Sequence, residues 1–195
     1  ICTGLVAAVN QQTVDKIKQQ EQQELMRVLH QLIPDEMHDN ELTAQCTLLL
    51  DKDALGTDSP MPAYIATSAG KPVAIAIEAI APDGYNGNIK LLVGISTKGE
   101  VLGVRTLAHQ ETPGLGDKID LRKSNWVSQF VGKVVGSADD KQWLVKKDGG
   151  DFDQFTGATI TPRAYVKAVK NAVWYFNNNQ AQIFSLPLNC EDNHD

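Results

Sequence analysis

The sequence predicts an α+β domain: an antiparallel or mixed β-sheet with helices packed on it, preceded by an N-terminal stalk helix. Between residues 46 and 107, short apolar segments alternate with turns rich in glycine, aspartate and proline, a pattern typical of consecutive strands. Residues 13–32 and 162–177 instead repeat their apolar side chains with a helical period. The sheet is therefore flanked by helices at both ends of the chain.

Composition limits the class of protein. The chain has 195 residues, 42% hydrophobic and 22% charged, which suits one folded domain with an appendage and excludes a wholly disordered protein. With 18 basic and 24 acidic residues the net charge is −6, which argues against nucleic acid as a partner. Three cysteines without a CxxC pair exclude a four-cysteine metal site, and His30, His38, His109 and His194 form no HxxxH pair, so the sequence predicts no metal site.

The chain begins with an apolar run, residues 1–9, which gives way abruptly to polar residues at Asn10. A membrane-spanning helix needs about 20 residues, so this run is too short to span a bilayer by itself. We interpret it as the end of a truncated membrane anchor. A short apolar start that docks on the protein's own core remains the alternative.

Residues 10–40 are predicted to form a stalk helix and linker that lead into the domain, residues 41–195. Residues 13–32 have helical composition, and the second half of this helix carries an apolar stripe at positions i, i+3, i+4 and i+7: Leu25, Val28, Leu29 and Leu32. Pro34 is expected to end the helix. The helix should thus begin solvated and become packed toward its end.

The predicted strands are residues 46–50, 63–67, 73–80, 89–95 and 101–107, and residues 51–62 read as a loop. Short glycine-containing turns between strands are typical of an antiparallel meander. The segment 73–80 is almost entirely apolar, so we expect it to be central and covered on both faces.

The pattern changes after residue 107. Residues 117–130 are predicted to form a helix and residues 142–146 a short strand. Residues 162–177 form the clearest helix, with a buried stripe at Val166, Val169, Val173 and Phe176. We expect Thr161 as its N-cap, Pro162 as its first residue and Asn177–Asn179 as its end.

Two glycine-containing loops precede predicted helices. In residues 151–161, the small residues Gly157 and Ala158 leave room for a ligand, and the N–H groups at the helix start favour a phosphate beside Thr159. In residues 109–117, Gly114 and Gly116 let the backbone approach a flat group. The residues alone also allow both loops to have no ligand. Residues 151–161 would then be a turn that leads into a capped helix, and residues 109–117 would be a strand-to-helix connection capped by Asp117.

The residues of both loops resemble known signatures. Asp153-Gln-Phe-Thr-Gly-Ala-Thr159 resembles the flavinylation motif of the FMN-binding domain family, and Glu111-Thr-Pro-Gly-Leu-Gly116 resembles its second signature. Both occur in the family's order, and the resemblance covers essentially the whole chain. The members it resembles are subunits of Rnf-type complexes and of the sodium-pumping NADH:quinone oxidoreductase.

The resemblance implies a role for each matching residue. Thr159 would carry FMN through a phosphoester bond, with Asp153 recognised by the flavin transferase that attaches it. Thr156, Gly157 and Ala158 would shape the bend, and Thr161 would hydrogen-bond the phosphate. In the other loop, Leu115 would cover the flavin ring, Glu111 and Thr112 would hydrogen-bond the ring or ribityl chain, and Gly114 and Gly116 would permit close approach.

The resemblance also implies a function. It predicts an electron-transfer flavoprotein subunit of a membrane-bound, ion-translocating oxidoreductase complex, with no turnover of its own and no catalytic residue. Its partners would be the other membrane subunits and, during maturation, the flavin transferase. A single N-terminal anchor would hold it in the bacterial inner membrane with its domain on the periplasmic side. The alternative is a non-redox extracytoplasmic ligand-binding or assembly module, in which the threonine motif only caps a helix.

Cys46 and Cys190 lie 144 positions apart. If the domain lies outside the cytoplasm they can form a disulfide, and Cys190 sits in a polar tail that otherwise lacks an anchor. Two unrelated buried thiols are the alternative.

Overall fold

The computed structural model describes residues 2–190, and of residues 2–12 the backbone alone. Its centre is a five-stranded sheet in which neighbours in sequence are neighbours in space, in the order β1-β2-β3-β4-β5. The strands are β1 (Cys46–Leu49), β2 (Met61–Ser68), β3 (Lys71–Ala81), β4 (Ile89–Ser96) and β5 (Val101–Ala108). Every pairing is antiparallel. The predicted meander is confirmed, and the mixed alternative is not needed.

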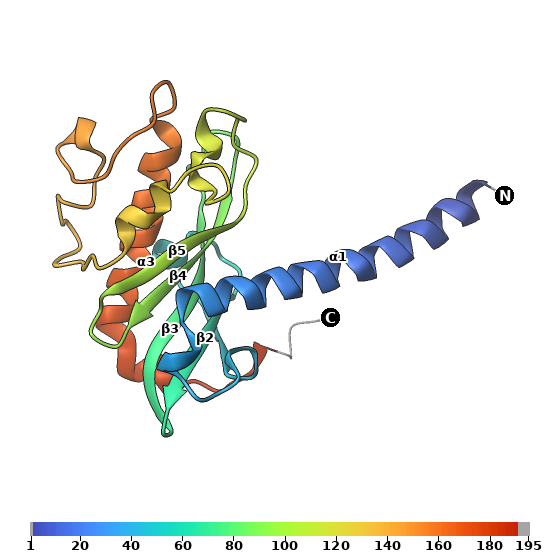
Figure 1. Ribbon diagram of the computed structural model, residues 1–195, viewed down its shortest axis with the longest axis horizontal. Coiled ribbons are helices and arrows are strands. Elements are labelled where there is room, and N and C mark those ends of the chain that lie inside the picture. The colour runs from blue at the N-terminus through green and yellow to red at the C-terminus, as the bar shows by residue number, and fades with distance from the viewer. Residues whose placement is uncertain (1, 191–195) are drawn as a thin grey trace.

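The sheet is covered on both faces (Figure 1). Helix α3 (Ile160–Phe184) packs on one face, where its stripe Val166, Val169, Val173 and Phe176 is buried in the main core. The last turns of helix α1 (Cys2–Leu32) pack on the other face in a second, smaller cluster. Strand β3 sends Ile75 and Ile77 into the first core and Ala74 and Ala76 into the second, because successive side chains of a strand point to opposite faces. This explains the nearly all-apolar sequence of β3.

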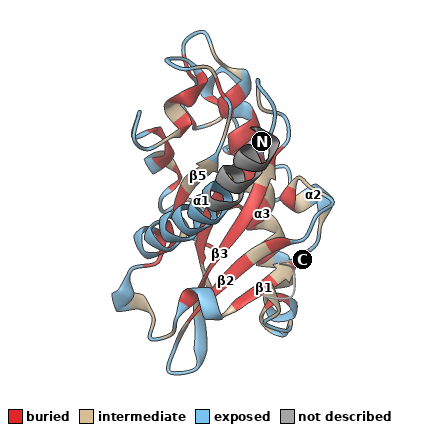
Figure 2. Cartoon of the chain, turned by 90° about the vertical axis from the view of Figure 1, so that its right-hand side faces the viewer, coloured by how far each residue is buried: buried red, intermediate tan, exposed pale blue. Residues whose placement is uncertain are grey.

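Helix α1 leaves the domain as a long arm (Figure 1). Residues 13–24 are exposed, whereas Val28, Leu29 and Leu32 are buried, so the predicted gradient from solvated to packed is confirmed (Figure 2). The helix ends at Leu32, ahead of Pro34. The side chains of the predicted anchor, residues 1–9, lie outside the described residues. Among the described residues, no helix has a stretch long and apolar enough to cross a membrane.

The predicted loop 51–62 contains a short helix, α2 (Lys52–Leu55). The side chain of Asp51 caps it by accepting a hydrogen bond from the backbone N–H of Ala54 at 2.9 Å. Gly56 follows in the left-handed conformation, and a Cβ there would lie 2.0 Å from the carbonyl oxygen of Ile80. Only glycine fits where α2 meets β3.

Two predicted elements are wrong. Residues 117–130 do not form one helix but two 3₁₀ turns, η3 (Gly116–Ile119) and η4 (Trp126–Phe130). The backbone N–H of Arg122 donates to the Asp120 carboxylate, and the backbone N–H of Trp126 donates to the Ser124 hydroxyl. These side chains take the place of the backbone carbonyls that would accept in a continuous α-helix. Residues 142–146 form no strand: only Val145 makes an isolated bridge, to Phe152, before the 3₁₀ turn η5 (Lys146–Asp148).

The bounds of the last helix also differ from the prediction. Helix α3 begins at Ile160, so Thr161 is not its N-cap but lies buried in its first turn, and Pro162 follows as its third residue. A proline is tolerated in the first turn because its missing N–H would have no helical partner. The predicted end at Asn177–Asn179 is a kink, where Asn179 has non-helical angles (φ −128°), and the helix continues to Phe184.

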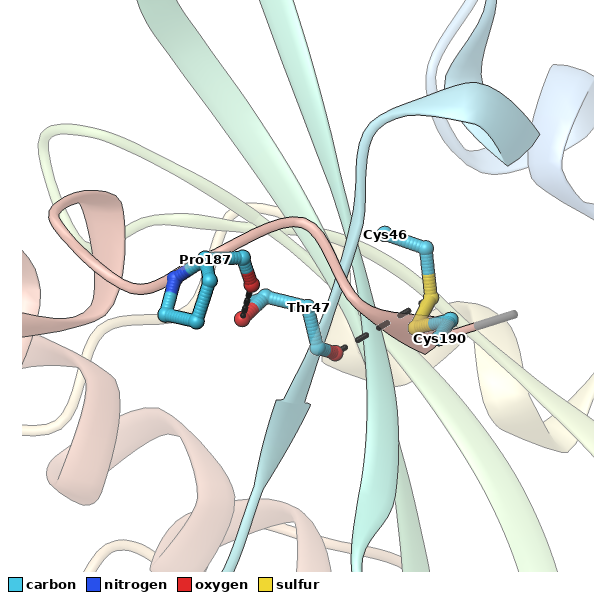
Figure 3. Close-up of a disulfide and its surroundings, with 4 residues drawn as sticks. All are labelled: Cys46, Thr47, Pro187 and Cys190. Carbon is cyan, nitrogen blue, oxygen red and sulfur yellow. Dashed lines mark hydrogen bonds between the residues drawn. A yellow bond between two sulfur atoms is a disulfide. The ribbon is translucent and has the colours of Figure 1, made fainter. Parts of the chain in front are cut away.

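The C-terminal tail returns to the first strand (Figure 3). A disulfide joins Cys46 to Cys190, with the two Cα atoms 5.5 Å apart. The hydroxyl of Thr47 donates a hydrogen bond to the carbonyl of Pro187 at 2.9 Å. These two contacts hold the chain beyond α3 against β1.

Candidate functional site

A cleft of about 290 Å³ lies where the two loops singled out in the sequence meet. The first loop contributes Glu111, Thr112, Leu115 and Gly116, the second contributes Gly157 to Thr161, and Tyr85 closes one side. The structure thus brings together segments some fifty residues apart, with Thr159 at the start of α3 in the cleft wall.

Thr159 is the residue before α3, but its side chain does not cap the helix. Within residues 2–190 its hydroxyl has no hydrogen-bond partner, and the side chain is partly exposed to the cleft. The first helical bond runs from the N–H of Arg163 to the carbonyl of Thr159. The N–H groups of Ile160 and Thr161 therefore have no acceptor within the helix, and with the helix dipole they favour a negative charge beside the Thr159 hydroxyl.

The bend before Thr159 depends on backbone conformation. Gly157 has a left-handed φ of 77°, and the N–H of Ala158 closes the turn on the carbonyl of Phe155 at 3.2 Å. A Cβ on Gly157 would meet only the Leu115 side chain, at 3.8 Å. Glycine is needed at this position for its φ angle, not for lack of space.

Glu111 acts as a brace within the protein. Its carboxylate is buried and accepts hydrogen bonds from the backbone N–H groups of Tyr85 (3.3 Å) and Asn86 (3.1 Å) and from the Thr161 hydroxyl. The sequence resemblance assigned Glu111 to the flavin ring or ribityl chain and Thr161 to its phosphate. In the structure their side chains bond each other where α3 meets the first loop, and both residues also line the cleft, so their roles toward the flavin stay predictions.

Gly116 makes room for this brace. A Cβ at Gly116 would lie 2.8 Å from the Thr161 hydroxyl oxygen and 3.0 Å from the Glu111 side chain. Gly116 thus lies close to the Glu111–Thr161 pair and also lines the cleft, and its close approach to a flat ring stays a prediction. Gly114, with φ 78°, donates its N–H to the carboxylate of Asp117 at 2.9 Å, so Asp117 stabilises the loop turn and does not cap a helix.

The rim of the cleft is apolar and open. Tyr85, Leu115 and Ile160 are among the exposed large hydrophobic side chains of the described chain, with 65%, 43% and 47% exposure. Leu115 was predicted from the sequence, but Tyr85 and Ile160 were not. Tyr85 comes from the turn between β3 and β4. The one feature of the sequence that could have pointed to it is an aromatic residue among the polar and glycine residues of a turn.

Asp153 and Thr156 do not line the cleft. The Asp153 carboxylate lies at the surface in an ion pair with Lys146 at 2.5 Å. Its backbone is held by the Trp126 indole, which donates to the Asp153 carbonyl at 2.7 Å, and by Gln129, which accepts from its N–H. Asp153 is thus a rigidly placed but outward-facing acid.

Comparison with known proteins identifies the family. The FMN-binding domain model matches residues 84–173, and the RnfG N-terminal region model matches residues 1–32. The G subunit of the ion-translocating oxidoreductase complex of Shewanella baltica strain OS223 is 98% identical over all 195 residues, which cover 92% of that protein. The chain belongs to this G-subunit family. The corresponding protein of Shewanella oneidensis strain MR-1 is 80% identical over 195 residues, all of this chain and 92% of the relative. That of Vibrio atlanticus strain LGP32 is 61% identical over 188 residues, 96% of this chain and 90% of the relative.

The FMN-binding match contains every residue that lines the cleft, from Tyr85 to Thr161. The residues present suit FMN: an unpaired hydroxyl and two helix N–H groups for the phosphate, and three exposed apolar side chains for a flat ring. The cleft volume is at the lower end of the range for ligand sites, so an isoalloxazine ring would keep an open edge. The RnfG N-terminal match at residues 1–32 coincides with helix α1.

Proposed function

We propose that this chain is an electron-transfer subunit of a membrane-bound ion-translocating oxidoreductase complex, with FMN esterified to Thr159. One observation carries the covalent assignment: the Thr159 hydroxyl borders the cleft and is not used to cap α3. A threonine before a helix ordinarily satisfies a free N–H group with its side chain. Here both the hydroxyl and the N–H groups remain available for a phosphate.

The chain's residues have distinct roles in this proposal. Thr159 supplies the oxygen of the ester, and the N–H groups of Ile160 and Thr161 stabilise the remaining negative charge of the phosphate. Leu115, Tyr85 and Ile160 give an apolar surface to the ring. FMN supplies the electron-accepting chemistry, whereas the protein supplies position and electrostatics.

A separate enzyme must form the bond, because a threonine hydroxyl is a weak nucleophile. The bond from Thr159 Oγ to the flavin phosphorus forms as a phosphorus–oxygen bond of a flavin donor with an activated phosphate breaks. The activating group leaves with the electron pair of the broken bond, and the flavin transferase takes the hydroxyl proton. Asp153 is suited to recognition by that transferase because its carboxylate faces outward beside Lys146. Thr156, also exposed, lies in the same accessible stretch.

Two features support the proposed periplasmic location of the domain. A disulfide between Cys46 and Cys190 suits an oxidising compartment such as the periplasm. Residues 1–9 would be the end of the single N-terminal anchor, residues 10–40 the stalk and linker, and residues 41–195 the periplasmic domain. The open apolar rim of the cleft lets another member of the complex approach the flavin edge.

The test uses the chain isolated from the membranes of its host. We expect a fluorescent band on denaturing electrophoresis and an intact mass increased by FMN less one water. Thr159→Val should abolish both signals and Thr159→Ser should retain them. Thr43→Val is the control, because it removes an exposed threonine hydroxyl outside the cleft and outside both loops and should leave the flavin in place. An unmodified wild-type polypeptide, or flavin retained by Thr159→Val, would overturn the assignment and favour the non-redox module.

A further inference from the structure

A cluster of metal-ligand types lies where the stalk helix enters the domain. His30 is in the last turn of α1, Asp35 begins the 3₁₀ turn η1 (Asp35–Met37), and His38 follows that turn. One ring nitrogen of each histidine and one carboxylate oxygen lie within 4.8 Å of one another. The sequence alone indicated no ligand set because the spacing His-x₄-Asp-x₂-His crosses the helix break at Pro34.

The His38 ring has one nitrogen that is hydrogen-bonded and one that is buried without a hydrogen-bond partner among the described residues. Its side chain is only 5% exposed, and its Nδ1 lies 2.9 Å from the backbone carbonyl of Asn40. Since a carbonyl only accepts hydrogen bonds, Nδ1 carries the proton and the neutral ring presents a lone pair at Nε2. That Nε2 is buried and has no hydrogen-bond partner within the described residues. It lies 3.8 Å from Asp35 Oδ1, beyond hydrogen-bond distance. Such a buried, unpaired acceptor is costly without a ligand.

The support behind His38 is rigid. The Asn40 side chain donates to the carbonyl of Ile65 and accepts from the N–H of Thr67, both at 2.8 Å. Both partners belong to β2, so the carbonyl that orients the His38 ring is fixed to the sheet. A hydrogen bond to the far nitrogen that orients the ring is the usual arrangement for a metal-binding histidine.

We propose that His30, Asp35 and His38 form a binding site for one divalent transition-metal ion of the zinc type. The ligand atoms are His30 Nδ1, an Asp35 carboxylate oxygen and His38 Nε2, and water completes the coordination. His30 Nδ1 and Asp35 Oδ1 are 2.6 Å apart and Asp35 Oδ1 and His38 Nε2 are 3.8 Å apart, which bracket the separation of about 3.3 Å between ligands of a tetrahedral zinc ion. Two imidazoles and one carboxylate favour zinc-type ions over magnesium or calcium.

Binding requires one proton change. Without metal, the Nδ1–H of His30 donates a hydrogen bond to the Asp35 carboxylate. When Nδ1 binds the ion, the proton of the neutral ring must lie on Nε2 instead. The His30 and Asp35 side chains are exposed, which leaves this side of the site open to water ligands. The bound ion would join the last turn of α1 to a loop pinned on β2. It would thus hold the stalk helix at one angle to the sheet, on the face opposite to α3.

The experiment is a calorimetric zinc titration of the full chain without a histidine tag, after removal of metal with a chelator. We expect one ion per chain, slower hydrogen exchange in the last turn of α1 when zinc is present, and no comparable binding of magnesium. Asp35→Asn and His30→Asn should each lower the affinity at least about tenfold. Both side chains are exposed, so circular dichroism should show that these variants fold normally.

Glu36→Gln is the matched control, because it makes the same charge change one residue from Asp35 at an exposed position outside the cluster. It should bind zinc like the wild type. Absence of saturable zinc binding, equal binding of magnesium, or full affinity in Asp35→Asn would each overturn the proposal. None of these results depends on whether Thr159 carries FMN, so this proposal and the flavin assignment fail separately.

Discussion

The Thr161 hydroxyl donates a hydrogen bond to the buried carboxylate of Glu111, which joins the first turn of α3 to the loop that forms the opposite wall of the cleft. The same carboxylate accepts from the N–H groups of Tyr85 and Asn86. One side chain therefore sets the distance between three segments around Thr159. An internal polar contact thus joins the segments that form the cleft walls.

Removal of the Glu111 carboxylate should destabilise the fold. Glu111→Ala leaves two backbone N–H groups and one hydroxyl without their acceptor, and we expect a loss of about 1–3 kcal/mol in the free energy of unfolding. Denaturant titration measures it. Thr161→Val should be milder, because the carboxylate keeps two donors.

The double variant separates this brace from an independent role for Thr161. If the two residues act together, the double variant should lose less stability than the sum of the single variants, with a coupling of about 0.5–3 kcal/mol. Purely additive losses would contradict the brace.

Gly116→Ala should disturb the same contact by steric means. The new methyl group would lie 2.8 Å from the Thr161 hydroxyl oxygen, and we expect destabilisation of about 1–3 kcal/mol and reduced flavin attachment. Gly136→Ala is the control, since the nearest atom to its Cβ is the Asp140 carboxylate at an ordinary 3.4 Å. Equal thermal melting of Gly116→Ala and the wild type would contradict this account.

Asp153→Asn should lower flavin attachment in the host without lowering stability, because its carboxylate contacts only an exposed lysine, Lys146. In-gel flavin fluorescence normalised to protein measures the attachment. Asp151→Asn is the control, as another exposed acid that pairs with a lysine, Lys133 at 3.7 Å. If both variants lost flavin equally, the loss would reflect the change in charge of the loop, and specific recognition of Asp153 by the flavin transferase would be contradicted.

Reduction of the Cys46–Cys190 disulfide should lower the free energy of unfolding. The bond closes a loop with a sequence separation of 144, for which the chain-entropy model gives about 5 kcal/mol. Denaturant titration with and without a reductant measures the change. The double variant Cys46→Ala/Cys190→Ala should not respond to the reductant. A wild type whose stability is unchanged by the reductant and in which all three cysteines titrate as free thiols would argue against the bond.

Glu78 should make stability depend on pH. Burial raises the pKa of its carboxyl above the ordinary 4.5, and Lys90 at 3.3 Å opposes this only in part. The favourable contribution of the protonated group is therefore present below pH 4.5 and is lost as the pH rises through the folded-state pKa.

Glu78→Gln should consequently be more stable than the wild type at neutral pH, and the difference should shrink as the pH falls through the raised folded-state pKa toward 4.5. Lys90 is 44% exposed and stays solvated without its partner. Urea titrations across this pH range measure the effect, and Glu100→Gln, an exposed position, is the control. A neutral-pH loss of stability in Glu78→Gln would contradict the prediction.

Local patterns account for what the sequence predicts correctly. The apolar segments and their turns specify the meander, as at Ala69-Gly70, where two residues with positive φ close the β2–β3 hairpin. The stripe of Val166, Val169, Val173 and Phe176 specifies the buried face of α3. By contrast, residues 117–130 have apolar spacing that suits a helix, but local side-chain hydrogen bonds break it.

Contacts between distant segments account for what the sequence does not predict. Glu111 and Thr161 are 50 residues apart, so no local pattern reveals that each satisfies the other. Tyr85 enters the cleft wall only because the β3–β4 turn lies beside both loops. His38 gains its orientation from Asn40, whose side chain depends on pairing with β2.

The covalent ring closed by Cys46 and Cys190 encloses both cleft loops but leaves α1 outside it. Tension applied through the arm enters the chain ahead of Cys46 and reaches the sheet on the face packed by Val28, Leu29 and Leu32. The walls around Thr159 are built on the opposite side and inside the closed ring. If α1 carries the proposed anchor, tension on it would thus act on the face of the sheet opposite to the one on which α3 packs.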